Sequence, residues 1–402
     1  MSYSENRIGD IQYAIKNKEV HRATAGLMDF VRDYLHDTLL FDEVIQLRKR
    51  YNNVRELGSS DIPENDSKEI LNQAKEILDK ALTYPIKEKE EDLLAKYPKH
   101  HLLQAVELTK IYSKGSFSLG PVSTVLKAGE ITGIVGENGN GKTTLLRILA
   151  RLLSFNSGKL SYTFDDTTED DDYRIKHKIA YIPQSLERWQ GTLKENLHYA
   201  ASIHGIHGQQ NTNDVEFVLH RMGLSNFAHL GWNELSSGYK LRFEIAKMLV
   251  WSPKILILDE PLANLDINAQ QWLLQDFKHI ARSLKNPVGI ILSSQQLFEV
   301  EHVADSIIFL RNGKCDYSGN MSEFMRDRQG NVFEISGDFT AALLQQALSS
   351  KSYYFTENGA SITVNTDLDI SSGDLLKDIL DSGYNLKYFR DISTSTKQLF
   401  KL

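Results

Sequence analysis

A glycine-rich segment, "GIVGENGNGKTTLLRIL" (residues 133–149), has residue types and a spacing that suit phosphate binding. It follows the Walker A pattern, with an apolar strand ending near Val135 before it and an amphipathic helix after it. Backbone N–H groups of the glycines can converge on phosphate oxygens, while Lys142 adds charge and Thr143 offers a hydroxyl to Mg²⁺. The segment predicts a nucleotide site. A glycine-rich turn without nucleotide is the alternative.

Two adjacent carboxylates end a second segment, "PKILILDEP" (residues 253–261). Ile255 to Leu258 are continuously apolar, which predicts a strand buried on both faces. At its end, Asp259 is placed to reach Mg²⁺ and Glu260 to polarise an attacking water as a general base. A strand ending in acidic residues is weak evidence alone. It becomes strong when it follows a Walker A segment in the chain.

The elements around these segments predict an α/β fold. From about Gln104, short β-rich runs alternate with helical ones, the pattern of a parallel sheet with crossover helices. The expected fold is therefore a P-loop NTPase cassette with a parallel core sheet. The acidic run from Asp165 to Asp172 interrupts it, and we interpret this run as a solvated loop, with metal binding as the less favoured alternative.

With both segments in this order, residues 104–320 resemble the nucleotide-binding domain of the ATP-binding cassette (ABC) superfamily. Five further features match: an aromatic in "LTKIYSKG", the Q-loop "YIPQSL", the signature "LSSGYKLRFEIAKMLV", the D-loop "ANLD" and the switch "ILSSQQ". Lys142 and Ser236 are fewer than a hundred residues apart. That spacing leaves no room for the coiled-coil insertion of chromosome-structural relatives, and translation-factor relatives carry two cassettes in one chain.

The resemblance implies ATP and Mg²⁺ as cofactors and assigns a role to each matching position. The catalytic residues would be Glu260, Gln295 and Gln184. Mg²⁺ would be held by Thr143, Gln184 and Asp259. The nucleotide would contact Tyr112, Gly136, Glu137, Asn138, Gly139, Asn140, Gly141, Lys142, Thr143, Thr144, Ser236, Gly238 and Asp266.

The resemblance also implies partners. Two cassettes of this family enclose ATP head to tail, so a chain with one cassette needs a second copy, which favours a homodimer, or a sister subunit. Ser236 and the Gly238 N–H would then face the phosphate of the other copy. A separate transmembrane permease subunit is expected, which would place this chain in the cytoplasm, at the inner face of the cell membrane.

Three positions depart from the family pattern. Ser237 replaces a glycine and Tyr239 a glutamine of the signature, and Gln295 replaces the switch histidine. Gln295 cannot become cationic, but its amide offers a donor and an acceptor. Losing a transition-state donor costs about 2.7 to 4 kcal/mol, and a neutral donor should cost less. We therefore expect slow but real hydrolysis, with Gln295 as a weaker γ-phosphate sensor. The alternatives are compensation by Gln296, or a merely structural Gln295.

Residues 1–100 predict a small helical bundle with a linker. The segment 67–82 has one apolar stripe at three- and four-residue steps, two shorter helices meet near Asn17, and a loop is expected from Gly58 to Ser67. The region weakly resembles bacterial effector-associated adaptor domains, which join proteins by homotypic contact. Such a domain would recruit a protein partner. The alternative is a helical extension that packs on the cassette, residues 101–325.

Residues 326–402 read as strand, helix, strand, strand, helix, strand, the order of a split βαβ or ferredoxin-like α+β domain. Asn358 and Gly359 are expected to form the turn between the middle strands. Together with the final segment, "DISTSTKQLFKL", this tail resembles ABC cassettes of the exporter type whose membrane subunits are separate polypeptides.

Composition narrows the class of protein. The 402 residues are 41% hydrophobic, enough for two or three domains. The single cysteine, Cys315, excludes an internal disulfide and favours a reducing compartment. No apolar run reaches the roughly 20 residues of a membrane helix. The net charge of −7 argues against a nucleic-acid partner.

Two functions remain open from the sequence. The first is an ATPase subunit that transmits closure of a cassette dimer to a membrane partner, through Gln184 and the segment "LERWQGTLKENL". The second is an ATP-gated regulatory or scaffold module with low turnover, whose helical domain recruits partners. ATP-dependent dimerisation with negligible turnover would favour the second.

Overall fold

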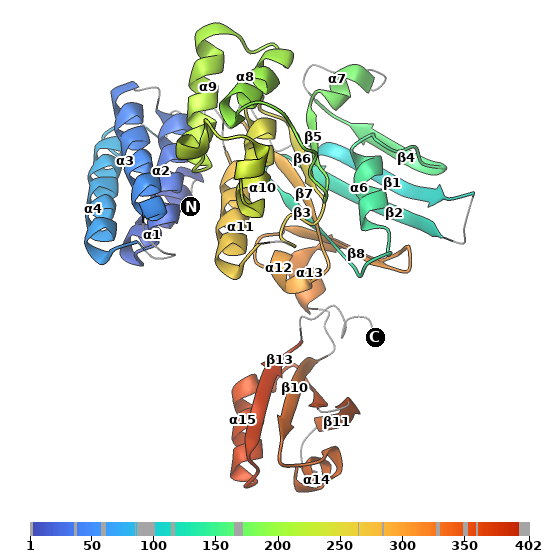
Figure 1. The fold of residues 1–402 in the computed structure, drawn as a ribbon. Helices are drawn as coiled ribbons and strands as arrows, with labels where there is room; N and C mark the ends of the chain where they lie inside the picture. The colour runs from blue at the N-terminus through green and yellow to red at the C-terminus, as the bar shows by residue number, and fades with distance from the viewer. Residues whose placement is uncertain are drawn as a thin grey trace.

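The computed structural model divides into three parts along the chain (Figure 1). The acidic run 165–171, the turn residue Gly359 and the tail 394–402 lie outside the described residues. The residues that the structure describes are 3–35, 38–57, 62–84, 86, 101–113, 117–164, 172–263, 265–283, 285–326, 330–348, 353–358 and 361–393.

The first part is a bundle of four helices. They are α1 (Tyr3–Lys16), α2 (Val20–Tyr34), α3 (Thr38–Leu57) and α4 (Glu64–Ala81). The predicted break near Asn17 and the apolar stripe of α4 are confirmed. The predicted loop is wrong from Glu64 onward, because Pro63 precedes the first turn and two acidic residues in that turn favour a helix N-terminus.

The central sheet of the second part has six strands in the order β5-β6-β7-β3-β8-β9, parallel except for antiparallel β9. Every residue of β3, β6 and β7 is buried, and for β6 this confirms the prediction from its continuously apolar segment. The strands are β3 (Ile131–Val135), β5 (Ile179–Ile182), β6 (Ile255–Leu258), β7 (Gly289–Ser294), β8 (Ser306–Arg311) and β9 (Lys314–Asn320).

A second, antiparallel sheet has the order β2-β1-β4, formed by β1 (His101–Ile111), β2 (Ser118–Lys127) and β4 (Ser157–Tyr162). Helix α6 (Lys142–Leu149) shares one buried core with this sheet and with the central sheet. The helix that follows the phosphate loop is therefore held between two sheets, which fixes the direction of its N-terminus.

The remaining helices of this part surround the central sheet, with α8 and α9 forming an arm beside α10 (Figure 1). Among the residues described, no helix is both long enough and apolar enough to cross a membrane. The helices are α7 (Asp172–Lys176), α8 (Leu193–Ile203), α9 (Gly208–Arg221), η1 (Ser225–Phe227), η2 (Trp232–Glu234), α10 (Ser237–Leu249), α11 (Ile267–Ala281), α12 (Leu297–Val300) and α13 (Met321–Arg326).

The third part is an α+β unit whose antiparallel strands have the order β11-β12-β10-β13. This order is that of the split βαβ arrangement, so the sequence prediction is confirmed. Its buried side chains form a core of their own, which includes Phe333, Ile335 and Val364. The elements are β10 (Asn331–Gly337), α14 (Ala341–Ala347), β11 (Tyr353–Asn358), β12 (Ser361–Thr366), α15 (Ser372–Asp381) and β13 (Leu386–Asp391).

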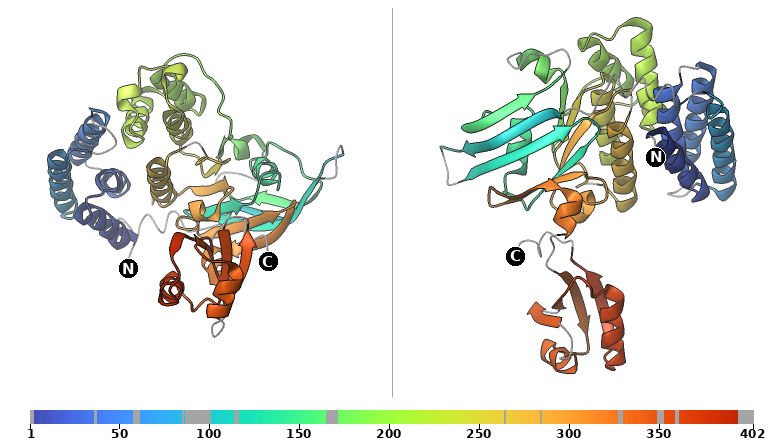
Figure 2. Two further views of the ribbon diagram at one scale, coloured as in Figure 1. Left: turned by 60° about the horizontal axis from the view of Figure 1, so that its bottom comes forward. Right: turned by 180° about the vertical axis from the view of Figure 1, so that it is seen from behind.

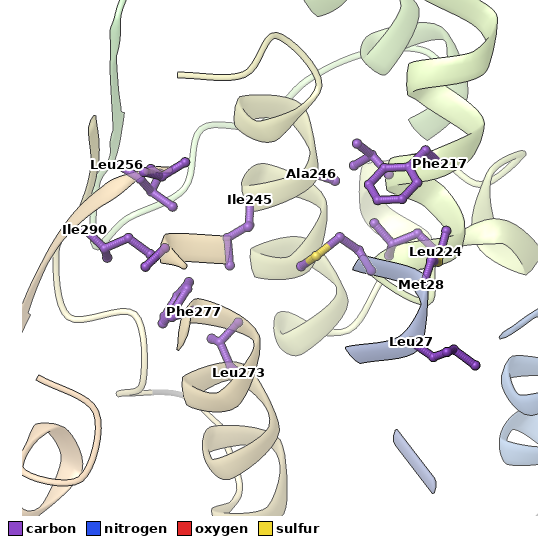
Figure 3. Packing of buried hydrophobic residues seen from close by; sticks show 14 of the residues in the cluster. Leu27, Met28, Phe217, Leu224, Ile245, Ala246, Leu256, Leu273, Phe277 and Ile290 are labelled. Atoms are coloured by element: carbon purple, nitrogen blue, oxygen red, sulfur yellow. The ribbon is translucent and has the colours of Figure 1, made fainter. Parts of the chain in front are cut away.

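The helical bundle, in contrast, shares one core with the cassette. Both views of Figure 2 place the bundle at α9 and α11, away from β1 and β2. Leu27 and Met28 of α2 belong to the same buried cluster as Phe217 of α9 and Phe277 of α11 (Figure 3). The bundle therefore packs on the cassette, as the second interpretation of the N-terminal region expected.

Buried charges cross the same junction. Arg221, at the end of α9, donates through Nε to Asp29 of α2 at 2.8 Å and through Nη1 to Asp276 of α11 at 2.7 Å. Arg48 of α3 is fully buried and donates to the carbonyl oxygens of His220 and Arg221, at the C-terminal end of α9. A cation is favourable there because the helix dipole is negative at that end. The bundle thus binds both the arm and the core of the cassette.

Candidate nucleotide-binding site

The phosphate loop lies between β3 and the first turn of α6. Gly139 and Gly141 have φ angles of 82° and 96°, which favour glycine. A side chain at Gly136 would come within 2.5 Å of the Leu310 carbonyl oxygen. Asn140 braces the loop through its side chain, which donates to that carbonyl and accepts from the Asn312 N–H. The loop therefore has the backbone conformation and the close contacts that its glycines predicted.

Lys142 connects the loop to the carboxylates at the end of β6. Its Nζ donates to the carbonyl oxygens of Gly136 at 2.8 Å and Glu137 at 3.2 Å, and it lies 3.1 Å from Glu260 Oε1. The Lys142 side chain is 4% exposed. The expected phosphate ligand and the expected general base are thus in direct contact.

Glu260 also accepts hydrogen bonds from the two glutamines that the sequence analysis placed at the site. Gln184 Nε2 and Gln295 Nε2 each donate to Glu260 Oε2 at 2.8 Å. Gln184 follows β5 and Gln295 follows β7, the two neighbours of β6 in the sheet. The structure therefore gathers all three expected catalytic residues around one carboxylate. Gln296 is exposed, and its backbone N–H contacts Ser294.

Asp259 is fixed by a residue that the sequence analysis missed. Ser293 Oγ donates to Asp259 Oδ1 at 2.8 Å and accepts the Glu260 N–H at 2.9 Å. The position of Ser293 in the sequence could have indicated this contact. Ser293 is the second-last residue of β7 in "ILSSQQ", and because the strand register pairs Leu258 with Leu292, the next residues, Asp259 and Ser293, are neighbours. The pKa of Tyr181, beside Asp259, is raised to about 12, mainly by burial and secondly by the Asp259 carboxylate. The Tyr181 hydroxyl therefore stays neutral.

The expected Mg²⁺ ligands are oxygen donors of the right kind. Thr143 follows Lys142 at the start of α6, and Asp259 and Gln184 follow adjacent strands β6 and β5. Within the described ranges no group of three or more His, Cys, Asp or Glu residues could hold a metal. A sparse set of one carboxylate, a hydroxyl and an amide suits Mg²⁺, which keeps waters and binds substrate phosphates.

The expected adenine-stacking residue lies beside the phosphate loop. Tyr112 follows β1, and its hydroxyl is 3.3 Å from the Thr144 Oγ1 atom in the first turn of α6. Tyr112 is 36% exposed as a whole residue, and its ring lies near that of Phe117. An accessible aromatic face at the start of α6 can stack on a base.

Comparison with known proteins decides the family. A profile of the ABC transporter family matches residues 119–263. The energy-coupling factor transporter ATP-binding protein EcfA1 of Thermotoga maritima is 33% identical over 224 residues, which cover 55% of this chain and 83% of that protein. The chain belongs to the ABC transporter family.

Two further relatives agree with this assignment. An uncharacterised ABC transporter ATP-binding protein of Bacillus subtilis, YxlF, is 29% identical over 284 residues, 69% of this chain and 92% of that protein. The structure of cbiO1 from Clostridium perfringens, part of the ABC transporter complex cbiONQ, has a TM-score of 0.51 at 24% identity and supports the fold. It covers 62% of this chain and 96% of its own.

The ABC assignment settles the general function. The chain is the ATP-binding and ATP-hydrolysing subunit of an ABC transporter, and such subunits dimerise and work with a membrane permease. This function is favoured over the scaffold alternative. The predicted fold class is confirmed, since the parallel sheet is preceded by a helical region and followed by the α+β unit.

The ABC signature lies at the start of α10, apart from the phosphate loop. Ser236 is the N-cap of α10, and its hydroxyl accepts from the Tyr239 N–H at 3.4 Å. Gly238 lies against Leu265, close to Asp266, which caps α11 by accepting the Ala269 N–H at 2.9 Å. The described contacts of these residues do not reach the loop 136–144.

Proposed function

We propose that Glu260 is the general base for the water that attacks the γ-phosphate of ATP. The observation that carries this proposal is the convergence of Gln184, Gln295 and Lys142 on the Glu260 carboxylate. Bound phosphates compete for Lys142, because a lysine ammonium is the usual partner of the outer phosphates in this loop. Its departure leaves Glu260 held by two neutral amides, which keep the carboxylate oriented.

Mg²⁺ would be bound by Thr143, Asp259 and, through its amide oxygen, Gln184. The Ser293 hydroxyl holds Asp259 in place, and the Gln184 NH₂ group is already engaged with Glu260, which leaves its oxygen for the metal. When bound, the ion neutralises charge on the transferred phosphoryl group. We assign the nucleotide contacts to Tyr112, to residues 136–144 and, from the second copy, to Ser236, Gly238 and Asp266.

Steady-state ATPase activity of the purified chain tests the base. Glu260→Gln keeps the shape of the side chain but cannot accept a proton, so turnover should fall by at least 10²-fold, the scale of general base catalysis, while ATP binding persists. Glu216→Gln, an exposed change on α9, is the matched control and should leave turnover unchanged. Unaltered turnover in Glu260→Gln would overturn the assignment.

Gln295 sets the speed of the reaction in this proposal. Its neutral amide donates to Glu260 and positions the carboxylate. The same amide would contact the γ-phosphate more weakly than the cationic histidine that the family has at this position. Gln295→His should raise kcat and Gln295→Ala should lower it, with little change in the affinity for ATP. If the alanine variant turned over as fast as the parent chain, Gln295 would have no part in hydrolysis.

The active form is proposed to be a homodimer with two ATP molecules between the cassettes. The first turn of α10, capped by Ser236, presents backbone N–H groups of the kind that bind phosphate. Glu260→Gln should accumulate as an ATP-dependent dimer in light-scattering measurements. A monomer at saturating ATP and Mg²⁺ would require a sister subunit instead.

The permease is proposed to dock near the segment that follows Gln184. A hollow of about 390 Å³ opens there, lined by Arg188, Trp189, Gln190, Gly191, Gly231, Trp232 and Asn233. Trp189 packs edge to face on Trp232 with ring centroids 5.5 Å apart, so the two rings form one aromatic patch of this surface. Docking would place the chain at the inner face of the cell membrane, and the resemblance of its tail favours an exporter.

We also propose three units with boundaries at 1–100, 101–325 and 326–402. The first would recruit a protein partner through the face of the bundle that does not contact the cassette. Co-purification of the full chain with proteins encoded beside it tests this role. Loss of a captured protein on reversing exposed charges such as Arg50 and Lys80 would support it, and capture that depends only on the cassette would contradict it.

A further inference from the structure

The hydroxyl group of Ser294, at the end of β7, has three polar neighbours. It accepts the Gln296 N–H at 2.9 Å and lies 2.9 Å from the Gln296 carbonyl oxygen. The third neighbour is the Glu299 carboxyl group of α12, which is also within hydrogen-bond distance. Ser294 is 2% exposed, so water competes little for these contacts. Because Gln295 lies between Ser294 and Gln296 in the chain, the two contacts to Gln296 enclose it.

The hydrogens of this cluster indicate the protonation state of Glu299. A hydroxyl group supplies one hydrogen, whereas a carbonyl oxygen and a carboxylate are acceptors only. Each of the two acceptors beside the Ser294 oxygen needs a hydrogen, and Ser294 can serve only one of them. Every contact is satisfied if Ser294 donates to the Gln296 carbonyl oxygen and a protonated Glu299 donates to Ser294. The observed contacts therefore fit a neutral Glu299.

The surroundings of Glu299 favour the neutral carboxyl group. Burial is the main influence and raises the pKa of Glu299, whereas the Ser294 hydrogen bond lowers it and the charge of Glu260 raises it again. Among the described residues, Glu260 is the only charged group that shifts this pKa. Helix α12 packs against β7 and β3, and neither strand carries a charged side chain. An ionised Glu260 and a neutral Glu299 thus favour each other.

Ionisation of Glu299 would change the hydrogen bonds around Gln295. The Ser294 hydrogen would turn to the carboxylate, and the Gln296 carbonyl oxygen would lose the Ser294 donor. One of the two bonds that enclose Gln295 would then be absent, and its side chain would be less firmly oriented. The Ser294 carbonyl oxygen also accepts the Gly136 N–H at 3.3 Å, so the same residue connects the switch segment to the phosphate loop.

We propose that Glu299 is a positioning residue for ATP hydrolysis, whose protonated carboxyl group holds Ser294 in the arrangement that directs Gln295 toward Glu260. The inference rests on the proposed role of Gln295 at Glu260. Because Glu299 acts through Ser294 and Gln295, its loss should lower kcat and leave the KM for ATP nearly constant. The rate should also decrease as pH rises through the pKa of Glu299, because the ionised form loses this arrangement.

Steady-state ATPase kinetics of the full chain, measured with MgATP over a range of pH, test this role. Glu299→Gln cannot ionise, but its NH₂ group can donate to Ser294 at any pH. Its kcat should equal the highest value of the parent chain and should lack the decrease at alkaline pH. Glu299→Leu has a similar size but no donor, so kcat should fall roughly two- to tenfold, the value of one hydrogen bond, with KM unchanged. Glu216→Gln on α9 is the matched control and should keep the pH profile of the parent chain.

A double variant separates this inference from the role of Gln295 itself. In the Gln295→Ala chain, Glu299→Leu should have no further effect, because the side chain that it positions is absent. A further fall of kcat by the same factor there, or an alkaline decrease that persists in Glu299→Gln, would overturn this inference alone. An unaltered kcat in Gln295→Ala would overturn the proposed role of Gln295 and this inference together. Thermal unfolding checks that each variant is folded, and if Glu299→Leu unfolds, the pH profile of Glu299→Gln decides.

Discussion

The two regions that flank the ABC cassette are joined to it in different ways. The N-terminal bundle continues the hydrophobic core of the cassette and places buried charges across the junction. The C-terminal α+β unit closes a core of its own between one face of its sheet and the helices α14 and α15. The bundle is thus part of the folded cassette, whereas the C-terminal unit has the packing of an independent domain.

Deletion should show the largest difference between the two regions. Removal of residues 1–100 would expose buried cassette side chains at the junction with α2, such as Phe217, Val218 and Met222. Each buried side chain of this size contributes about 1.5–3 kcal/mol, so their sum is comparable to the roughly 5–15 kcal/mol stability of a domain. We expect aggregation or unfolding at room temperature.

Removal of residues 330–402 is the matched deletion. The remaining chain keeps both cores of the cassette, so its yield and its thermal transition should stay close to those of the full protein. Circular dichroism during heating measures both variants. If the chain without its bundle melted at the same temperature as the parent, the shared core would have no energetic importance.

Arg221 carries the largest expected effect of a single side chain at the junction. Burial alone would raise the pKa of Asp276, but Arg221 and His21 hold it well below its usual value, so the carboxylate is charged. Arg221→Met would leave Asp29 and Asp276 buried without their cation, which costs about 3–5 kcal/mol. Urea unfolding of the full chain measures this loss.

A rescue variant distinguishes charge from packing. Adding Asp29→Asn and Asp276→Asn to Arg221→Met removes the uncompensated charges, so part of the lost stability should return. A loss below about 1 kcal/mol in Arg221→Met, the range of exposed ion pairs, would show that the junction is solvated.

The candidate nucleotide site could be located from the sequence because its residues lie in segments with a local pattern. The loop 136–144 and the pair Asp259 and Glu260 lie within short segments whose flanking strands and helices are readable from periodicity. Ser293 was missed because its partner is fixed only by strand register across the sheet.

The junction was not predictable in the same way. Arg221, Asp29 and Asp276 are far apart in the chain and look like ordinary surface charges on three amphipathic helices. Only the packing of α2 against α9 and α11 shows that these charges are buried together. The α+β unit, in contrast, was predicted from its order of elements, because its core is formed within 63 residues, from Asn331 to Ser393.

The junction also predicts a dependence of stability on pH. The pKa of His21 and the pKa of His279 are both lowered to about 3, mainly because the two side chains are buried. The second cause is the charge of Arg48 for His21 and that of Arg7 for His279. Below pH 6.5 the unfolded chain therefore binds protons that the folded chain does not, and the free energy of unfolding falls as pH decreases. Each histidine contributes up to about 1.4 kcal/mol per pH unit, while above pH 6.5 the full stability is present.

Urea unfolding at pH 7.5, 6.5 and 5.5 measures this slope. His279→Gln should flatten it, and the exposed His229→Gln should not. The isolated segment 330–402 contains no histidine, so its stability should hardly change over this range. An equal slope in the two regions would show that the junction histidines are not the cause.

The smallest effect is expected at an ion pair of the C-terminal unit. Lys387 of β13 contacts Asp338, with side chains that are 61% and 60% exposed, whereas Arg221 and Asp276 are 3% and 4% exposed. Water screens the exposed pair, and holding two long side chains together costs entropy. Lys387→Met should therefore change the free energy of unfolding by no more than about 0.5 kcal/mol. A loss as large as that of Arg221→Met would mean that burial does not govern which charges stabilise this protein.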